Sequence, residues 1–171
     1  SVIVGVALTL PISSAAICAA LSLTGLAGGA AVAGCCAQMI GFAVISFADN
    51  GWGGFFAQSL GTSMLQMGNI CKKPQIWIPP IITSAILGPI STAVLKMTCY
   101  SSGAGMGTSG LVGQFMTYAS MTDAGTSAKT VLIEIIIMHV IAPALITLGI
   151  SELLRSKNII HFGDMELKDI N

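Results

Sequence analysis

Uncharged and mostly apolar stretches follow one another along the chain, separated by short polar breaks. Residues 1–48, 50–71, 74–95 and 97–122 contain no Asp, Glu, Lys or Arg. A helix needs about 20 apolar residues to cross the hydrocarbon core of a bilayer. Four successive stretches of at least that length favour membrane-spanning helices over the apolar core of a soluble domain.

The pattern predicts four crossing helices, several of them interrupted by proline. Proline lacks an N–H and cannot donate to the carbonyl four residues earlier, so it kinks or breaks a helix. We expect this at Pro11 in the first span, at Pro89 in the third and at Pro143 in the last. The expected spans lie near residues 2–23, 26–47, 76–95 and 131–154.

Two further stretches are uncharged but too polar or too glycine-rich for ordinary lipid-facing spans. Residues 52–70 carry several amides and hydroxyls, and residues 103–113 contain five glycines. Such backbone is tolerated at membrane depth where it lines a cavity or is covered by protein. We therefore predict re-entrant segments near 52–70 and 101–119, with a flexible external loop as the alternative for the second.

The predicted fold is an all-α integral membrane protein with about four transmembrane helices, two re-entrant segments and proline kinks. The membrane domain covers residues 1–154, and a short charged tail follows at 155–171. With this tail in the cytoplasm, five basic residues lie inside and two outside, which agrees with the positive-inside rule. The inside residues are Lys72, Lys73, Arg155, Lys157 and Lys168, and the outside residues are Lys96 and Lys129.

Composition supports a membrane protein and argues against several other classes. Charged residues make up 8% of the chain, against about 25% in a typical soluble domain. The formal net charge is zero, and no basic patch indicates a nucleic-acid partner. The five cysteines form no CxxC motif and no cluster with histidine, so we expect neither a metal site nor a cofactor.

Small residues in the second span predict close helix packing. Gly25 and Gly29 have the GxxxG spacing, and Ala30 and Gly34 repeat it. Membrane helices associate through close approach of their backbones, since burial of apolar surface gives no driving force in lipid. We therefore assign Gly25, Gly29 and Gly34 to helix packing.

Ionisable residues at membrane depth are candidate solute ligands. Glu134 is the only acidic residue inside an expected span, where such a group by default faces a cavity or a partner. The alternative is that it reaches interfacial water. His139 is a candidate for solute binding or proton transfer, with plain packing as its alternative. Their spacing puts the two side chains on different helix faces unless Pro143 distorts the helix.

Neutral amides and the glycine-rich segment complete the candidate site. Amides, including Gln38 and Asn69, can bind an uncharged polar solute or another helix. Residues 105–110 match GxGxxG, but a dinucleotide site needs a βαβ unit that the pattern does not offer, so exposed backbone at membrane depth is preferred. No residue pattern indicates a catalytic group. The candidate solute-binding residues are Glu134, His139, Asn50, Gln58, Gln66, Gly105, Gly107, Thr108, Ser109 and Gln114.

Motifs along almost the whole chain resemble those of one bacterial membrane family. They include Gly25-Leu-Ala-Gly-Gly29, Asn50-Gly-Trp-Gly-Gly54, Ile76-Trp-Ile-Pro-Pro80 and the glycine-rich segment 103–113. This is the phosphotransferase-system EIIC-like family, also called the toxin regulator family after the perfringolysin regulator. Its members are about twice as long, and the chain resembles their C-terminal half. Part of the solute site is therefore expected outside this sequence.

The resemblance implies a permease component for a neutral polar solute, with a sugar as the expected solute. It also leaves two alternatives: a membrane sensor that regulates toxin or other genes indirectly, and a scaffold that packs against a partner chain. In phosphotransferase systems a separate EIIB unit carries the phosphoryl group, so this chain alone is not expected to be an enzyme. The implied setting is the bacterial inner membrane, with a cytoplasmic C-terminal tail. The implied partners are the lipid bilayer, a sugar, an EIIB-like phosphoryl carrier and a second copy or partner half.

Overall fold

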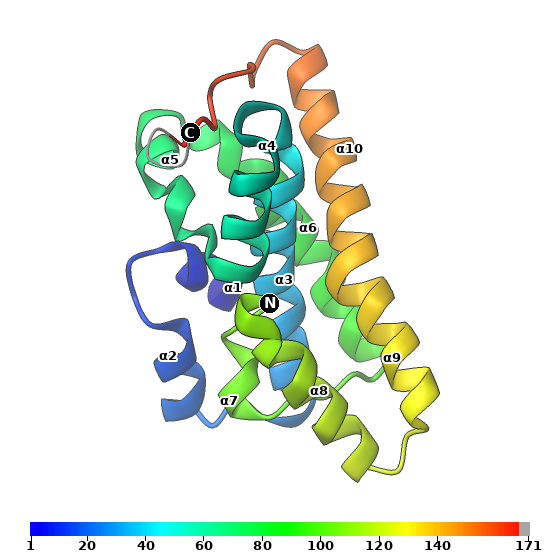
Figure 1. The fold of residues 1–171 in the computed structure, drawn as a ribbon. Coiled ribbons are helices and arrows are strands. Elements are labelled where there is room, and N and C mark those ends of the chain that lie inside the picture. The colour runs from blue at the N-terminus through cyan, green and yellow to red at the C-terminus, as the bar shows by residue number, and fades with distance from the viewer. Residues whose placement is uncertain (168–171) are drawn as a thin grey trace.

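One central helix, α3 (Gly25–Ile45), organises the structure, and the other helices surround it (Figure 1). The computed structural model describes residues 1–167. Its regular elements are all helical, and among these residues the only strand-like pairing is a single bridge between Gly25 and Cys99. The prediction of an all-α chain is therefore confirmed.

Three helical stretches are long and apolar enough to cross a membrane, judged by length and composition. They are Gly25–Ile45, Pro74–Val94 and Ala128–Ser156, with 21, 21 and 29 residues. At 1.5 Å per residue, the shorter two extend about 32 Å, close to the thickness of the hydrocarbon core of a bilayer, about 30 Å. They overlap three of the four spans that the sequence predicts.

The first predicted span folds as two short helices, α1 (Val2–Thr9) and α2 (Ser14–Ala20). The break falls at Pro11, where the missing N–H predicts it. The hydroxyl of Ser13 accepts a hydrogen bond from the N–H of Ala16 at 3.2 Å and caps α2. This part of the chain therefore has no continuous helix of spanning length, and the described residues contain three such helices instead of four.

Two helical hairpins approach the middle of α3 from opposite ends of the bundle (Figure 1). The first hairpin consists of α4 (Phe47–Phe56), η1 (Ala57–Gly61), η2 (Ser63–Gln66) and α5 (Met67–Lys72). The second hairpin consists of α7 (Ser101–Ala104), η5 (Ser109–Leu111) and α8 (Val112–Asp123). The two hairpins occupy the stretches for which the sequence predicts re-entrant segments.

The other two long helical stretches each continue through a π-helical turn beside a proline. The first combines η3 (Pro74–Trp77), α6 (Ile78–Pro89) and η4 (Ile90–Val94). The second combines α9 (Ala128–Ile136), η6 (Ile137–Ile141) and α10 (Ala142–Ser156). Pro89 directly precedes η4, and Pro143 follows η6. A π turn shifts the hydrogen-bond register, so the helix continues where the proline removes a donor.

Glycines bring neighbouring backbone against α3. A Cβ atom at Gly29 would overlap the Met97 carbonyl, and one at Gly34 would overlap the Ser1 carbonyl. Gly25 differs, because open space surrounds its Cβ position and its φ is +64°. This left-handed conformation favours glycine at the start of the helix. Gly29 and Gly34 thus lie at close contacts, whereas Gly25 allows the chain to turn into α3.

Hydroxyls of the third span donate to backbone carbonyls of α3. Ser84 Oγ donates to the Gly34 carbonyl at 3.1 Å, and Ser91 Oγ donates to the Gly29 carbonyl at 3.2 Å. Both serines are buried. Such bonds require backbones that lie close together, which the absence of a side chain on Gly29 and Gly34 permits.

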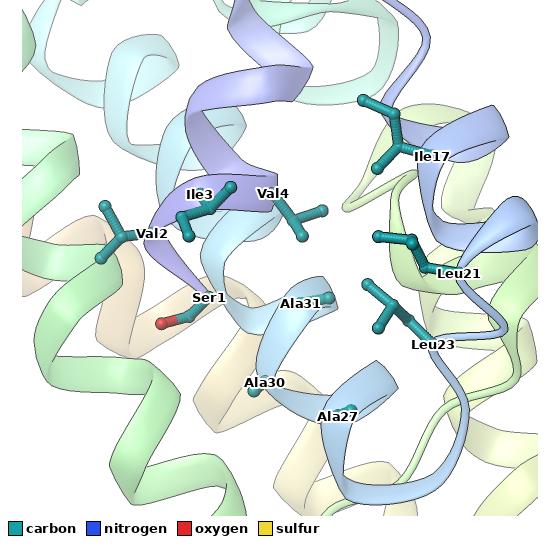
Figure 2. Close-up of a pocket in the computed structure, with 10 residues that line it drawn as sticks. All are labelled: Ser1, Val2, Ile3, Val4, Ile17, Leu21, Leu23, Ala27, Ala30 and Ala31. Atoms are coloured by element: carbon teal, nitrogen blue, oxygen red, sulfur yellow. The ribbon is translucent and has the colours of Figure 1, made fainter.

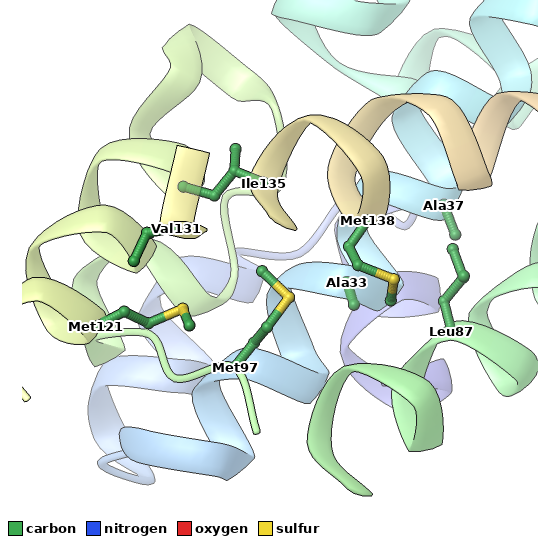
Figure 3. Packing of buried hydrophobic residues seen from close by; sticks show 8 residues of the cluster. All are labelled: Ala33, Ala37, Leu87, Met97, Met121, Val131, Ile135 and Met138. Atoms are coloured by element: carbon green, nitrogen blue, oxygen red, sulfur yellow. The ribbon is translucent and has the colours of Figure 1, made fainter. Parts of the chain in front are cut away.

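Apolar side chains fill the space between α3 and the elements of the second half of the chain (Figure 3). Three of them are methionines, whose flexible side chains fill irregular gaps. The methionine side chains converge between the helices in Figure 3. The members of this cluster are Ala33, Ala37, Leu87, Met97, Met121, Val131, Ile135 and Met138.

The chain after α10 folds back over one end of the bundle (Figure 1). Ile160 and Met165 are buried against Phe42 of α3 and its apolar neighbours. The described part of the predicted tail is therefore packed onto the helices. Lys168 and the residues after it, which the sequence analysis placed in this tail, lie outside the described residues.

Replacing Gly29 with leucine is expected to destabilise the protein. The new side chain would meet the Met97 backbone, which cannot move away as a flexible side chain could. Overpacking of this kind costs about 3 kcal/mol. We expect a clearly lower midpoint of thermal unfolding in detergent.

Gly149→Ala is the matched control. Gly149 lies within α10, with open space around its Cβ position, so alanine should leave stability unchanged or raise it by about 0.5–1 kcal/mol. Equal midpoints for Gly29→Leu and the wild-type chain would contradict the close packing of α3.

Candidate functional site

Uncharged polar side chains meet around Gln38, which is fully buried near the middle of α3. The indole Nε1 of Trp77 donates to Gln38 Oε1 at 2.8 Å, and Thr9 Oγ1 donates to the same oxygen at 3.3 Å. Gln38 Nε2 donates to Ser84 Oγ at 3.4 Å. The hydroxyls of Thr9 and Ser63 are 2.8 Å apart. We call these five residues the central cluster, and it joins α1, α3, η2, η3 and α6.

The two hairpins meet beside the central cluster. Thr108 Oγ1, in the second hairpin, donates to the Ser59 carbonyl in the first at 2.5 Å. The same hydroxyl lies 3.6 Å from Met39 Sδ, so the meeting point rests on α3. Ser14 Oγ of α2 donates to the Gly105 carbonyl at 2.7 Å and fixes the second hairpin from the other side.

The glycine-rich segment packs tightly instead of opening to a cavity. A Cβ atom at Gly105 would overlap the Ser14 carbonyl, and one at Gly107 would be too close to Cys35. Gly107 also has a φ of +54°, which glycine adopts readily. Ser109, in contrast, is only half-buried. Of the candidate residues in this segment, Thr108 makes the contact to the other hairpin.

The amides of the first hairpin form a separate group at the end of the bundle that carries Lys73. Gln66 Nε2 donates to Gln58 Oε1 at 3.0 Å, and Asn69 Nδ2 donates to Gln66 Oε1 at 2.9 Å. Asn50 Nδ2 and Gln66 Nε2 both donate to the Met165 carbonyl, at 2.8 and 3.0 Å. Asn50, Gln58 and Gln66 are therefore brought together, but their partners are protein groups.

Gln114 and His139 form a third polar group. Gln114 Nε2 lies 3.3 Å from His139 Nδ1 and 3.5 Å from Cys36 Sγ of α3. His139 is fully buried, and neither its Nε2 nor Gln114 Oε1 has a hydrogen-bond partner among the described residues. His139 lies in the π turn η6, which is the distortion that Pro143 predicts. Gln114 Oε1 can therefore accept a hydrogen bond, and His139 Nε2 can donate or accept one according to the tautomer of the ring.

Glu134 is not joined to His139 by any hydrogen bond of the described residues. It is half-buried on α9, and its Oε2 is buried without a hydrogen-bond partner. The candidate residues thus fall into several places: the meeting point of the hairpins, the amide group, the Gln114–His139 pair and Glu134.

Sequence reasoning did not select the residues of the central cluster. The pattern indicates Gln38 as an amide at membrane depth, but it does not indicate the partners Thr9, Ser63, Trp77 and Ser84. The sequence signal for this cluster is the position of Gln38 in an otherwise apolar span. An amide there has to find hydrogen-bond partners because lipid offers none.

Three pockets of the described residues have mainly apolar linings. The first, of about 570 Å³, lies between α1, α2 and the start of α3 (Figure 2). In Figure 2, Ile17, Leu21 and Leu23 face Val4 and Ala31 across it. The second, of about 530 Å³, lies between α8 and α9, and the third, of about 350 Å³, lies beside α4. Such linings suit apolar chains better than a polar solute.

Comparison with known proteins assigns a family. The family model described as "Phosphotransferase system, EIIC" matches residues 1–167, which is nearly the whole chain. No curated protein and no solved structure matches the chain significantly.

Replacing Thr108 with valine tests the contact between the hairpins. Valine keeps the shape of the side chain but leaves the buried Ser59 carbonyl without its donor. An unsatisfied buried group costs about 1–3 kcal/mol. We expect a lower midpoint of thermal unfolding, whereas the control Ser109→Ala, at a half-buried neighbour, should stay within about 0.5 kcal/mol of wild type. Equal effects of the two substitutions would show that the contact is not specific.

Proposed function

The chain belongs to the phosphotransferase-system EIIC family, and we propose that it forms part of a membrane permease for a neutral polar solute, with a sugar as that solute. The observation that carries this proposal is the central cluster. It gathers an amide, three hydroxyls and an indole in the middle of the bundle, and none of its members is charged.

The chemistry of the central cluster suits a sugar. A sugar hydroxyl both donates and accepts hydrogen bonds, and so do the hydroxyls of Thr9, Ser63 and Ser84. The Gln38 amide offers two donors and an acceptor, and the Trp77 indole offers a donor beside an apolar surface. An uncharged solute can exchange hydrogen bonds with this cluster without leaving a buried charge unpaired.

The arrangement of the hairpins supports transport by alternating access. Each hairpin reaches the middle of α3 from one end, and they meet at Thr108 and Ser59. If both are re-entrant, withdrawal of one hairpin opens the central cluster to one side of the membrane while the other keeps it closed. Broken helices that meet at the midplane serve this purpose in transporters.

We further propose that the end of the bundle carrying Lys73 faces the cytoplasm of a bacterial inner membrane. Lys73 pairs with Asp164, and Arg155 stacks on Phe162 at 4.2 Å, so these basic residues lie at the end covered by the chain after α10. Basic residues favour the cytoplasmic side. The sensor remains the alternative to this permease.

Three further roles complete the proposal. Gln114, His139 and Glu134 have buried polar atoms without partners and are candidates for a second part of the solute path. Phosphoryl transfer is assigned to an EIIB-like carrier, which would approach from the cytoplasmic end. A second copy or a partner half would cover part of the exposed apolar helix faces, and lipid the rest.

The central test measures sugar binding by the intact protein in lipid nanodiscs, with calorimetry over a broad panel of sugars. Gln38→Leu is expected to weaken the affinity of the best sugar by about 10- to 100-fold, because buried partners are left unpaired. Trp77→Phe keeps the ring and removes one donor, and it should cost about tenfold.

Ser151→Ala is the matched control, because Ser151 is buried in α10 and its Oγ has no hydrogen-bond partner among the described residues. It should bind sugar as the wild type does, and thermal unfolding of each variant checks its fold. No saturable binding by any sugar would count decisively against the permease. Deleting the gene separates the sensor: changed transcripts with unchanged solute uptake would favour it.

Glu134→Gln tests the acidic candidate. A carboxylate that accepts a hydrogen bond from the solute is worth more than a neutral amide in the same place, so we expect affinity to fall by about tenfold. Calorimetry in nanodiscs measures the change. Unchanged affinity would remove Glu134 from the solute path and assign it to the interface with lipid.

A further inference from the structure

Residues 159–167, which we call the strap, are bound through their main chain by side chains of the first hairpin. Asp49 accepts from the N–H of Gly163 at 2.9 Å and from that of Met165 at 3.3 Å. Asn50 binds on both sides of residue 166, because it donates to the Met165 carbonyl at 2.8 Å and accepts from the N–H of Leu167 at 2.7 Å. The hairpin therefore forms a cradle for peptide backbone.

Two more amides extend the cradle. Gln66 Nε2 donates to the Met165 carbonyl at 3.0 Å, and Asn69 Nδ2 donates to the Glu166 carbonyl at 3.0 Å. The Met165 carbonyl thus receives two donors and occupies the place between Asn50 and Gln66. Asn50 and Gln66, which the sequence predicts to bind solute, thus donate hydrogen bonds to the strap of their own chain.

A polar clasp holds the edge of the strap. Lys73 Nζ lies 2.5 Å from Asp164 Oδ2 and 2.9 Å from His161 Nδ1, and the same carboxylate accepts from the N–H of His161 at 2.6 Å. Burial acts to raise the pKa of Asp164, but the hydrogen bonds from Lys73 and His161 outweigh it and hold this pKa below its usual value. Because the pKa of Asp164 is lower in the docked strap than in the released one, ionised Asp164 stabilises docking at any pH above the ordinary carboxylate pKa. This stabilisation is lost as the pH falls from the ordinary pKa through the lowered one. The clasp is therefore complete at neutral pH.

The strap can leave its cradle without unfolding a helix. It contains no helix or strand, and the bonds that hold it in the cradle end on side chains of other elements. Lys73 and Asp164 are both partly exposed, so their pairing is open to solvent. Release also exposes Ile160 and Met165, which are buried against Phe42 in the docked state, so opening has to overcome this apolar contact as well as the hydrogen bonds of the cradle.

Release of the strap would affect the central cluster through η2. Gln66, which binds the strap, is the last residue of η2, and Ser63, which binds Thr9, is the first. Thr9 in turn donates to Gln38. One turn of helix thus connects the strap to the centre of the bundle.

We propose that residues 159–167 form a detachable strap that, when docked, occupies Asn50 and Gln66 and holds η2 against the central cluster, and that, when released, frees both amides and loosens η2. The strap is then a regulatory element at the Lys73 end of the protein. Only the meaning of the central cluster as a solute site rests on the proposed function.

The experiment weakens the clasp in the intact protein in lipid nanodiscs and measures two rates without any solute. Hydrogen exchange followed by mass spectrometry reports opening of residues 159–167. Alkylation by N-ethylmaleimide reports exposure of a cysteine at position 63, placed by Ser63→Cys in a Cys71→Ser background. Ser63 is fully buried, and Cys71 is the only exposed cysteine of the described residues.

Asp164→Asn should raise both rates by the same factor, about two- to fivefold, because a partly exposed ion pair contributes modestly to docking. Lys73→Gln is the second variant and should act in the same direction. The control is Asp123→Asn, which removes an exposed carboxylate that accepts from Tyr100 at 2.6 Å and is not part of the strap. It should change neither rate.

Unchanged hydrogen exchange of residues 159–167 in both clasp variants would overturn the proposal that the clasp holds a detachable strap. Faster exchange with unchanged alkylation at position 63 would overturn its coupling to the central cluster. If the wild-type protein binds no sugar, the proposed function fails. The exchange and alkylation rates still test whether the strap detaches, because they are measured without solute.

Discussion

The structure depends on how closely other segments can approach the backbone of α3. Gly29 and Gly34 let the Met97 and Ser1 carbonyls come within contact of the helix, and Ser84 of α6 and Ser91 of η4 donate to the carbonyls of Gly34 and Gly29. Lipid does not drive apolar helices together, so packing and internal hydrogen bonds have to do so. A helix of small residues allows close packing and internal hydrogen bonds together. For this reason α3 contacts both hairpins and the two other long helical stretches.

This close packing also concentrates polar groups in the middle of the bundle. Gln38 would be costly in an isolated span, since lipid offers it no partner. In the folded chain it holds Thr9, Trp77 and Ser84, and the hairpins meet next to it at Thr108 and Ser59. The same groups that make assembly favourable are those a neutral solute can use. Under the proposed function, stability and solute binding draw on one set of hydrogen bonds.

Hydrophobic patterning predicted the helical class and four spans, of which three are long helices in the described residues, because length and apolar composition are local properties of the sequence. It also located the break at Pro11, but not the division of this stretch into two short helices, α1 and α2. The partners of Gln38 could not be predicted, since Thr9 and Ser84 lie 29 and 46 residues away along the chain. The amide of Asn50 can donate equally well to a sugar or to a peptide carbonyl, so the residue type alone does not predict which of the two it binds.

The strap also has a consequence for the order in which the chain is completed. Asn50 and Gln66 are synthesised 115 and 99 residues before Met165, the residue whose carbonyl they bind. At about 5–20 residues per second, the amides wait roughly 5–20 s for this partner on the ribosome. During that interval Asn50 and Gln66 lack the Met165 carbonyl that they bind in the folded protein, although Gln66 can already donate to Gln58. A nascent chain is therefore chemically distinguishable from a completed one at this surface.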